Sequence, residues 1–351
     1  MRPWGNLPGD DPERDRKRTE AELEAAGIDL DPTPPGRTRP IEEHGPAGHE
    51  HPHQHSVPGG TPIIGIVGAG AVGTALGVAL SRAGWPIHAV SSRDPSRRER
   101  FRSLVDVNRA FVDPEPLVEE VELIILAVPD DAVAPLAGTL RMYGGQAMIH
   151  TSGLLGADVL APAMAAGTQV GSFHPLVAFA DTERAVAALH GATVAIEADD
   201  QLAAMLAAMA EAIGATPVRL AAGSKAAYHA AAVLAAGGFV ALLDAIAELG
   251  RVAGLDEAGS LAVYGGLIEG TLGNARALGI ATALTGPITR GDLGTLRAHL
   301  DALRSHAPGA MALYVAAGRR EIDLAEGRGA LAPGVAVAMR RVLDDAVARP
   351  D

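Results

Sequence analysis

The residue with the clearest chemical signal is a lysine. Only two of the 29 basic residues are lysines, Lys17 and Lys225. Because nearly all basic positions of this chain are arginine, a lysine is expected only where arginine cannot replace it. A lysine amine can be tuned toward neutral pH and exchange a proton, which a guanidinium cannot do. His229 follows Lys225 by four residues, on the same face of a predicted helix. We expect a catalytic pair, the alternative being a surface lysine beside a buried histidine.

A glycine-rich turn predicts a nucleotide site. Gly68, Gly70 and Gly73 form the pattern G-x-G-x-x-G between a β-branched run and a helical pattern. The first glycine permits a tight turn, the second lets the backbone approach a pyrophosphate, and the third lets helix and strand pack closely. The N–H groups of Ala71 and Val72 then face the phosphates from a helix N-terminus. The alternative is a purely structural glycine turn.

The end of the second predicted strand indicates which dinucleotide binds. A carboxylate there would bind the ribose 2′-hydroxyl and select NAD. The residues found there are Ser91, Ser92 and Arg93, with Arg97 and Arg98 following. Hydroxyl and guanidinium groups suit a 2′-phosphate, so we expect NADP (NADPH) as the cofactor. Asp94 leaves NAD open as the alternative.

A second cofactor contact is expected after the strand predicted at 122–128. Val128 and Pro129 lie at its carboxyl end, and ligands of doubly wound sheets bind at that edge. The alternative is an ordinary loop in which Asp130 caps the next helix. The two interpretations are compatible.

Polar residues at two further strand ends predict a substrate site. His150, Ser152 and Gly153 lie around the end of the strand 146–150, and His174 closes the strand 168–173. Hydroxyl, imidazole and backbone N–H groups together suit a carboxylate or carbonyl oxygen. Each histidine taken alone is more often a structural residue.

One further candidate substrate contact lies in the C-terminal half. Arg290 can hold a carboxylate with two parallel hydrogen bonds, and Asp292 lies close to it in sequence. The alternative is that Asp292 caps the following helix and Arg290 is its partner.

Alternating patterns predict the elements that position these residues. Strand patterns lie at 62–67, 86–91, 122–128, 146–150, 168–173, 192–196 and 216–220, and helical patterns at 71–83, 130–141 and 200–213. Near-continuous apolar strands separated by helices predict an α/β fold, a doubly wound Rossmann-type parallel sheet with both faces covered. After residue 220 only helical patterns remain, at 224–252, 257–278, 291–306, 310–317 and 335–348. We expect an NADP-binding domain at 61–220 and an all-helical substrate and dimerisation domain at 221–351.

Composition excludes several classes of protein. The formal charge of −13 argues against a nucleic-acid partner, and the absence of cysteine excludes disulfides and thiolate metal sites. Residues 1–60 hold ten of the 24 prolines and alternating histidines, which predicts a disordered tail. Because a flexible His/Pro tract lacks preorganised geometry, we expect no metal site.

The sequence also bears on location and assembly. The N-terminus lacks the apolar core of a secretory signal. The longest apolar run, 230–243, has 14 residues, fewer than the roughly 20 of a membrane span. We therefore expect a cytoplasmic protein without a membrane segment. The run is expected to be a helix buried in protein, and a homodimer would complete its burial.

These motifs together resemble a known superfamily. The glycine turn, His150-Thr-Ser-Gly and Lys225-x-x-x-His229 are similar to the β-hydroxyacid dehydrogenase and ketopantoate reductase superfamily, with a C-terminal half of the 6-phosphogluconate dehydrogenase type. S-F-H-P at 172–175, K-A-A-Y-H-A-A-A at 225–232 and T-G-P-I-T-R-G-D at 285–292 resemble, more narrowly, bacterial Rossmann-like oxidoreductases with a C-terminal domain of unknown function. The resemblance covers residues 61–345.

The resemblance implies hydride transfer between NADPH and a small carbonyl substrate, with a 2-oxo acid such as ketopantoate favoured. Lys225 then matches the catalytic lysine, and Ser152-Gly153 the substrate-binding turn. His229 departs from the usual asparagine, and Ala236-Gly237 from the Ser-Asn frequent in the narrower group. Imine reduction of the pyrroline-carboxylate type, a deazaflavin:NADP oxidoreductase and a non-catalytic NADP-binding sensor remain alternatives.

Overall fold

The computed structural model describes residues 60–165, 167–179 and 181–348. The chain divides into two compact units between Tyr228 and His229, and each unit is described by itself. The division falls within helix α9 (Lys225–Val233), a few residues after the boundary expected at 220. The tail expected at 1–60 lies outside the described residues except for Gly60, and so do its histidines.

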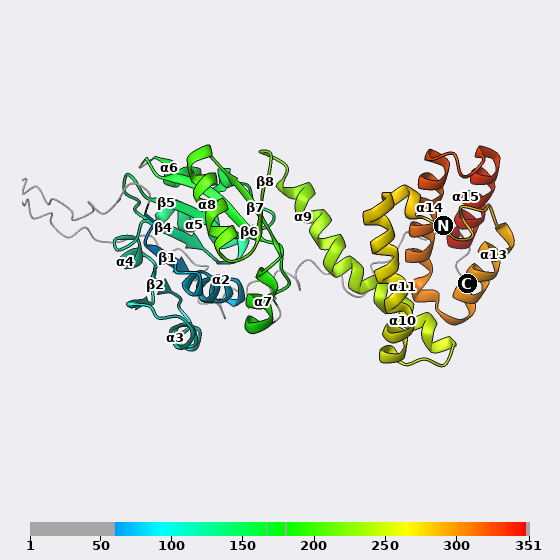
Figure 1. The fold of residues 1–351 in the computed structure, drawn as a ribbon, viewed down its shortest axis with the longest axis horizontal. Coiled ribbons are helices and arrows are strands. Elements are labelled where there is room, and N and C mark those ends of the chain that lie inside the picture. Colours follow the sequence, from blue (N-terminus) through cyan, green and yellow to red (C-terminus); the bar gives the residue numbers. More distant parts are fainter. Residues whose placement is uncertain (1–59, 166, 180, 349–351) are drawn as a thin grey trace, which may run out of the picture. The chain divides into compact units, whose positions relative to one another are not determined.

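The first unit is built on an eight-stranded sheet with the order β3-β2-β1-β4-β5-β6-β7-β8 (Figure 1). Its strands are β1 (Ile64–Val67), β2 (Ile87–Ser91), β3 (Arg109–Phe111), β4 (Leu123–Leu126), β5 (Ala147–His150), β6 (Gln169–Pro175), β7 (Thr193–Ala198) and β8 (Thr216–Arg219). The pairs are parallel except β6 with β7, which is antiparallel. The expected α/β fold with a Rossmann-type sheet is confirmed, and the sheet is mostly parallel; the expected parallel direction is wrong for β7 and β8, which run opposite to the other six strands. A strand buried on both faces has the same apolar pattern in either direction, so its sequence does not reveal its direction.

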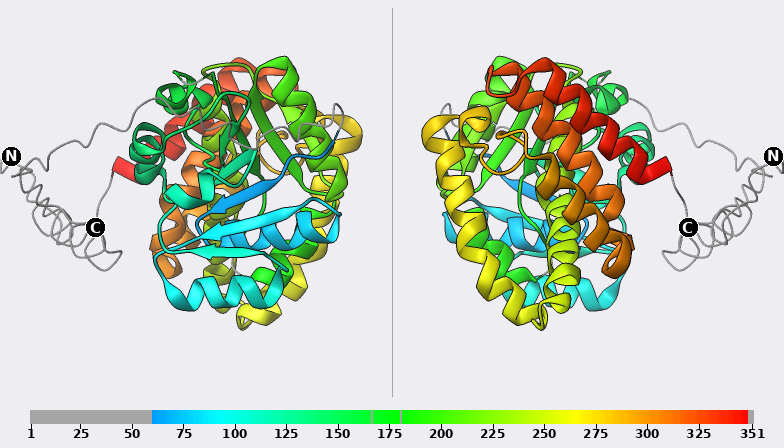
Figure 2. Two further views of the ribbon diagram at one scale, coloured as in Figure 1. Left: turned by 90° about the vertical axis from the view of Figure 1, so that its left-hand side faces the viewer. Right: turned by 90° about the vertical axis from the view of Figure 1, so that its right-hand side faces the viewer.

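Helices pack on both faces of this sheet through two separate cores; the left view in Figure 2 shows strands of the sheet with helices beside them. One core joins strand residues such as Ile66 with Leu76 and Leu206; its helices are α2 (Ala71–Arg82), α3 (Pro95–Leu104), α7 (Thr182–Leu189) and α8 (Asp200–Ala212). The other core joins Leu126 with Val133; its helices are α4 (Glu115–Val118), α5 (Asp130–Thr139), η1 (Ala157–Leu160) and α6 (Ala161–Met164). These two cores hold the carboxyl ends of the central strands in fixed positions.

The second unit is helical. Its elements are the end of α9, η2 (Leu234–Gly238), α10 (Phe239–Val252), α11 (Glu257–Leu278), α12 (Ile280–Ala283), α13 (Leu293–His306), η3 (Pro308–Ala310), α14 (Met311–Gly327) and α15 (Pro333–Ala348). Its main core packs α13, α14 and α15 together through residues such as Leu296, Ile322 and Met339. Helix α11 begins and ends where the sequence pattern predicts. The helix predicted at 310–317 extends further, to Gly327.

The helix predicted at 224–252 is present, with a π-helical turn in its middle. Helix α9 continues through η2 into α10. Among the described residues, 225–252 form one helix long and apolar enough to cross a membrane, with a mean hydropathy of 2.1 and only 6% of its most apolar window buried. The expectation that this helix is buried in protein is therefore wrong within one chain. Leu234 is 72% exposed and Leu267 of α11 is 69% exposed, so apolar side chains of both helices remain open to solvent.

Candidate active site

The glycine turn between β1 and α2 has the tight geometry that its sequence predicts. Gly68 has a φ of +105°, which side-chain-bearing residues rarely adopt, and its N–H donates to the Ser91 carbonyl at 2.8 Å. A Cβ at Gly68 would lie 2.3 Å from the Ala127 carbonyl oxygen, and one at Gly73 would lie 2.0 Å from the Gly68 carbonyl oxygen. Only glycine fits at both positions. The turn is thereby packed against the loops that follow β2 and β4.

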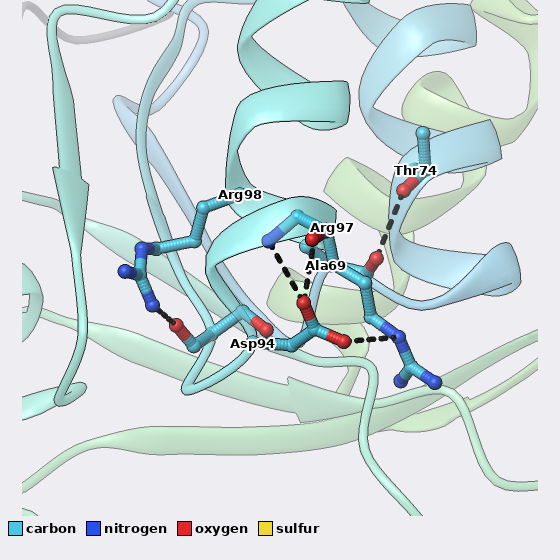
Figure 3. A network of polar contacts seen from close by, with 7 residues as sticks. Ala69, Thr74, Asp94, Arg97 and Arg98 are labelled. Carbon is cyan, nitrogen blue, oxygen red and sulfur yellow. Dashed lines mark hydrogen bonds and ion pairs between the residues drawn. The ribbon is translucent and has the colours of Figure 1, made fainter.

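Gly70 differs from the other two glycines because it faces open space. No atom lies within 4 Å of a Cβ built there. Gly70 is the N-cap of α2, without a side-chain cap and without acidic residues in the first turn. Thr74 secures the turn from behind, since its hydroxyl donates to the Ala69 carbonyl at 3.3 Å (Figure 3). The first N–H groups of a helix have no acceptor within it and carry partial positive charge. Those of Ala71, among others, are therefore available to an anion.

The end of β2 carries the residues that we expect to select NADP. Ser91 is buried and Arg93 is exposed. Asp94 is committed to α3: its carboxylate accepts hydrogen bonds from the Ser96 and Arg97 N–H groups at 2.8 and 3.1 Å and lies 3.3 Å from the Arg97 Nε (Figure 3). This cap accounts for Asp94 without a ribose contact, which weakens the NAD alternative.

The other two arginines of this cluster are partly committed to local contacts. Arg98 donates from its guanidinium to the carbonyl of Ser92 (Figure 3). Arg97 is paired through its Nε alone, and its side chain is 64% exposed. The cluster therefore shapes the loop after β2 in addition to adding positive charge to it.

The loop after β4 lies beside the glycine turn. The Val128 side chain lies 3.2 Å from the position of a Cβ at Gly68, so both expected cofactor loops meet at one edge of the sheet. The N-cap of α5 is Pro129, with no side-chain cap, and Asp130 and Asp131 lie in its first turn. The alternative in which Asp130 is the N-cap is therefore wrong. The two carboxylates stabilise the positive end of the α5 dipole instead.

Lys225 lies in the first unit with its amine buried. Its side chain is 2% exposed, and its Nζ donates to the Ser152 carbonyl at 2.8 Å. Burial lowers the pKa of Lys225 from 10.5 to about 8, whereas the negative charges of Glu197 and Asp130 act in the opposite direction. A buried amine with such a pKa exchanges protons near physiological pH. The sequence singled out Lys225 but gave no indication of its contact with Ser152.

The turn that receives Lys225 is held by its own polar groups. The Ser152 Oγ accepts hydrogen bonds from the N–H groups of Leu154 and Leu155 at 3.1 and 3.0 Å. The Ser152 N–H donates to the His150 Nδ1 at 3.2 Å, while the His150 Nε2 lies 3.0 Å from the Gly156 carbonyl oxygen. Because an N–H only donates and a carbonyl only accepts, the proton of His150 belongs on Nε2.

His150 is fully buried and neutral. Burial lowers its pKa from 6.5 to about 4, the hydrogen bond to Gly156 opposes this, and the charge of Lys225 adds to it. With both ring nitrogens bonded to the backbone, His150 has the structural role that the sequence left open. Its neighbour Gly153 lies at the bend of the turn, next to the Ser152 carbonyl, and is buried.

His174 contacts Tyr228, a residue for which no role was expected. The His174 Nδ1 and the Tyr228 hydroxyl are 3.1 Å apart, and the two rings meet edge to face with centroids 5.7 Å apart. Burial raises the pKa of Tyr228. Tyr228 follows Lys225 by three residues on α9, a helical spacing that could have indicated a shared face. Glu197, whose charge acts on Lys225, was likewise not among the residues expected from the sequence.

The remaining expected residues belong to the second unit. His229 follows Tyr228 on α9. Arg290 is exposed. Asp292 caps α13 by accepting hydrogen bonds from the Thr295 N–H at 3.0 Å and the Thr295 hydroxyl at 2.7 Å. These bonds lower the pKa of Asp292, and the charge of Arg290 contributes. The geometry therefore favours Asp292 as a helix cap, the alternative to a substrate contact. Within the described part of the chain, no three acidic or histidine side chains are grouped to hold a metal.

Two families match parts of the chain. Residues 52–175 match the Rossmann-like domain, and residues 192–321 match a domain of unknown function, DUF2520. No curated protein matches. These two matches agree with the resemblance to Rossmann-like oxidoreductases with a C-terminal domain of unknown function. Neither match names the wider β-hydroxyacid dehydrogenase and ketopantoate reductase superfamily.

Solved structures share the fold. A proposed NADP oxidoreductase from Bacteroides fragilis is 26% identical, with a TM-score of 0.59 over 74% of this chain and 98% of that protein. A reductive aminase from Aspergillus terreus, in complex with NADPH and ethyl levulinate, is 18% identical, with a TM-score of 0.59 over 81% and 99%. An imine reductase from Pseudomonas sp. is 18% identical, with a TM-score of 0.58 over 82% and 100%. At these lower identities the last two establish likeness of fold.

Proposed function

We propose that this chain is an NADP-dependent oxidoreductase. The observation that carries the proposal is the turn before α2. Backbone oxygens leave no room for a side chain at Gly68 and Gly73, whereas Gly70 faces free space at the helix N-terminus. If the turn were only structural, Gly70 would not need to be glycine, because a side chain there would meet no other atom. The likeness to an NADP oxidoreductase from Bacteroides fragilis supports the same cofactor.

The residues present fit a dinucleotide with a 2′-phosphate. The N–H groups of Ala71, Val72 and Gly73 would hold the pyrophosphate, and the loop at Val128 and Pro129 would border the nicotinamide half. Ser91, Ser92 and Arg93 would bind the 2′-phosphate, since Asp94 is used as a cap. When bound, NADPH supplies the hydride.

The cofactor assignment is tested by comparing NADPH and NADH affinities. We expect Arg93→Ala to weaken NADPH binding by roughly tenfold to a hundredfold, the range for loss of one charged hydrogen-bond partner, and to leave NADH binding unchanged. Arg102→Ala is the matched control, because this exposed arginine lies at the other end of α3. Unchanged NADPH binding in Arg93→Ala would refute the assignment.

We further propose that Lys225 donates the proton in the reaction. Reduction of a carbonyl group builds negative charge on its oxygen, which a nearby acid must stabilise and protonate. An amine with a pKa of about 8, held at 2.8 Å from a backbone carbonyl, is suited to that step. His229, one helical turn further along α9, would orient the amine or the substrate. The turn at Ser152 and Gly153 would bind the substrate, with His174 on β6 as a further proposed contact.

The leading substrate class is a small 2-oxo acid such as ketopantoate, which the sequence motifs favour. Imine reduction is the second candidate, because several solved structures with this fold act on imines or form amines. Loss of NADPH absorbance across a panel of 2-oxo acids, cyclic imines and carbonyl–amine mixtures, with deazaflavin in parallel, distinguishes these classes. If NADPH binds but is not oxidised with any compound of the panel, a non-catalytic NADP-binding sensor becomes the favoured function.

The role of Lys225 is tested on the best substrate of that panel. We expect Lys225→Met to lower kcat by about a hundredfold or more, the usual contribution of a general acid, with NADPH affinity nearly unchanged. Normal turnover in this variant would end the proposal.

We also propose that the chain acts as a homodimer in the cytoplasm. Exposed apolar side chains of η2, α10 and α11, such as Leu234, Val240 and Leu267, are those that a second copy would cover. Asp244 and Glu248 lie on the same helical run and are costly in lipid, which favours protein over membrane as the covering partner.

Light scattering after gel filtration tests the dimer. Val240→Glu and Leu267→Glu should shift the protein to monomer, whereas Val112→Glu, an exposed apolar position of the first unit, should not. A monomeric wild type, or recovery of the wild type in the membrane fraction, would refute the proposal.

A further inference from the structure

Four hydrogen bonds, joined by short stretches of backbone, connect the amine of Lys225 to a carboxylate on β7. Both lie in the first unit. The bonds run from the Lys225 Nζ to the Ser152 carbonyl, from the Ser152 N–H to the His150 Nδ1, from the His150 Nε2 to the Gly156 carbonyl, and from the Ala157 N–H to the Glu197 Oε2 at 3.3 Å. The turn 150–157 is thus tied at both ends.

We propose that His150 and Glu197 are positioning residues for Lys225. His150 holds the turn that presents the Ser152 carbonyl to the amine. Glu197 ties the far end of that turn and places a negative charge within reach of the ammonium. The catalytic meaning of this support rests on the proposed function, because Lys225 is the proposed proton donor there.

The chemistry of His150 suits this role. One side of its ring must accept from an N–H and the other must donate to a carbonyl, which only a neutral imidazole does. The ring is completely buried, and its low pKa keeps it neutral at physiological pH. A charged ring would lose the bond to Ser152 and would repel Lys225.

The sheet explains why Glu197 can reach the same place. His150 pairs with Ser172 across β5 and β6, and Ser172 pairs with Glu197 across β6 and β7. Directly paired residues project their side chains from the same face of a sheet. The three side chains therefore form a row behind the turn. Lys225 is faced by charge from Glu197 on β7 and Asp130 on α5, and by neutral His150 on β5.

Ser172 provides a matched control within this row. It is buried between His150 and Glu197, and its hydroxyl has no hydrogen-bond partner among the described residues. Ser172→Ala changes a side chain between His150 and Glu197 but removes none of the hydrogen bonds that connect Lys225 to Glu197.

The lysine count makes a direct test possible without any substrate. With Lys17 and Lys225 as its only lysines, the full chain labelled with ¹³Cε-lysine gives two lysine side-chain signals, and Lys17→Arg assigns them. The pKa of Lys225 is then read from a pH titration in the wild type and in Glu197→Gln, His150→Ala and Ser172→Ala.

The two positioning variants should shift the pKa of Lys225 in opposite directions. Glu197→Gln keeps the shape and an acceptor oxygen for Ala157 but removes the charge, so the pKa should fall by roughly one unit from about 8. His150→Ala frees the turn and admits water to the amine, so the pKa should rise toward 10.5. Ser172→Ala should leave it unchanged.

An unchanged pKa in Glu197→Gln, or shifts of both variants in the same direction, would overturn the proposal. If His150→Ala fails to fold, Glu197→Gln decides alone, because it is nearly isosteric. The pH profile of kcat should follow the titrated pKa in each active variant. If the titrations behave as expected but Lys225→Met keeps its turnover, the support stands and the proposed function fails.

Discussion

Alanine substitutions in the glycine turn separate folding from cofactor binding. At Gly73 a Cβ would lie 2.0 Å from the Gly68 carbonyl oxygen, so the backbone itself must move. Overpacking of this kind costs about 1–3 kcal/mol, and the better helix propensity of alanine returns less than about 1 kcal/mol. We therefore expect Gly73→Ala to lose roughly 1–2 kcal/mol of the free energy of unfolding.

Gly70→Ala should behave in the opposite way. No atom lies within 4 Å of the new Cβ, and Gly70 is in the extended region with a φ of −76°. Replacing glycine by alanine at an N-cap costs roughly 0.5–1 kcal/mol, and the lower entropy of the unfolded chain returns about 0.4–1 kcal/mol. The unfolding free energy should stay within about 0.5 kcal/mol of the wild type. The added methyl group occupies the space proposed for the pyrophosphate, so NADPH affinity should fall about tenfold or more, which corresponds to about 1.4 kcal/mol.

Two measurements on the same samples decide the matter. Denaturant unfolding without cofactor gives the stabilities, and a fluorescence titration with NADPH gives the affinities. The reasoning is refuted if Gly70→Ala is destabilised as much as Gly73→Ala, or if Gly70→Ala binds NADPH as tightly as the wild type does.

Three further outcomes are expected. The pKa of Lys225 is about 8 in the folded chain against 10.5 in the ordinary case, so the unfolded chain binds more protons between these values. The wild type should therefore gain stability relative to Lys225→Met as the pH rises from 8 to 10.5, by up to about 3 kcal/mol; parallel unfolding curves at each pH check this, and a flat difference contradicts it. Asp94→Ala should cost about 1 kcal/mol through the lost cap and release Arg97, so that thermal unfolding shows a lower midpoint while titration shows equal or tighter NADPH binding. Asp292→Ala should lower the unfolding midpoint through the lost cap on α13 and leave the KM of the best substrate unchanged; a raised KM would place Asp292 in the substrate site after all.

Local patterns predicted most of the fold. Strands such as β4 are short apolar runs, and the glycine turn carries its geometry in three residues, so both could be recognised from sequence. Helix α3 could not, because half of its residues are charged and only Phe101 is buried. Strand β3 has three residues and lies at the sheet edge, too short for a pattern.

The candidate site was predicted in its residue types but not in its contacts. Lys225 stands out by composition, whereas the Ser152 carbonyl that it contacts lies 73 residues earlier in the chain. Glu197 reaches the same turn only because β7 runs against β6, and nothing in the run ATVAIE reveals that reversal. His150 was expected at a substrate, but its two backbone bonds depend on how the following turn folds. The contacts of the site therefore depend on pairing between residues far apart in the chain, which local sequence patterns do not show.

The burial of Lys225 also makes this residue a reporter of local opening. An amine reagent cannot reach a side chain that is 2% exposed and bonded to Ser152. Acylation of Lys225 therefore requires that the turn and helix α9 separate first. The rate of acylation, followed by mass spectrometry of a single peptide, would measure how often this separation occurs in the native protein. A ligand that slows the labelling, even one of unknown chemical identity, must then either cover the amine in the opened state or stabilise the closed arrangement.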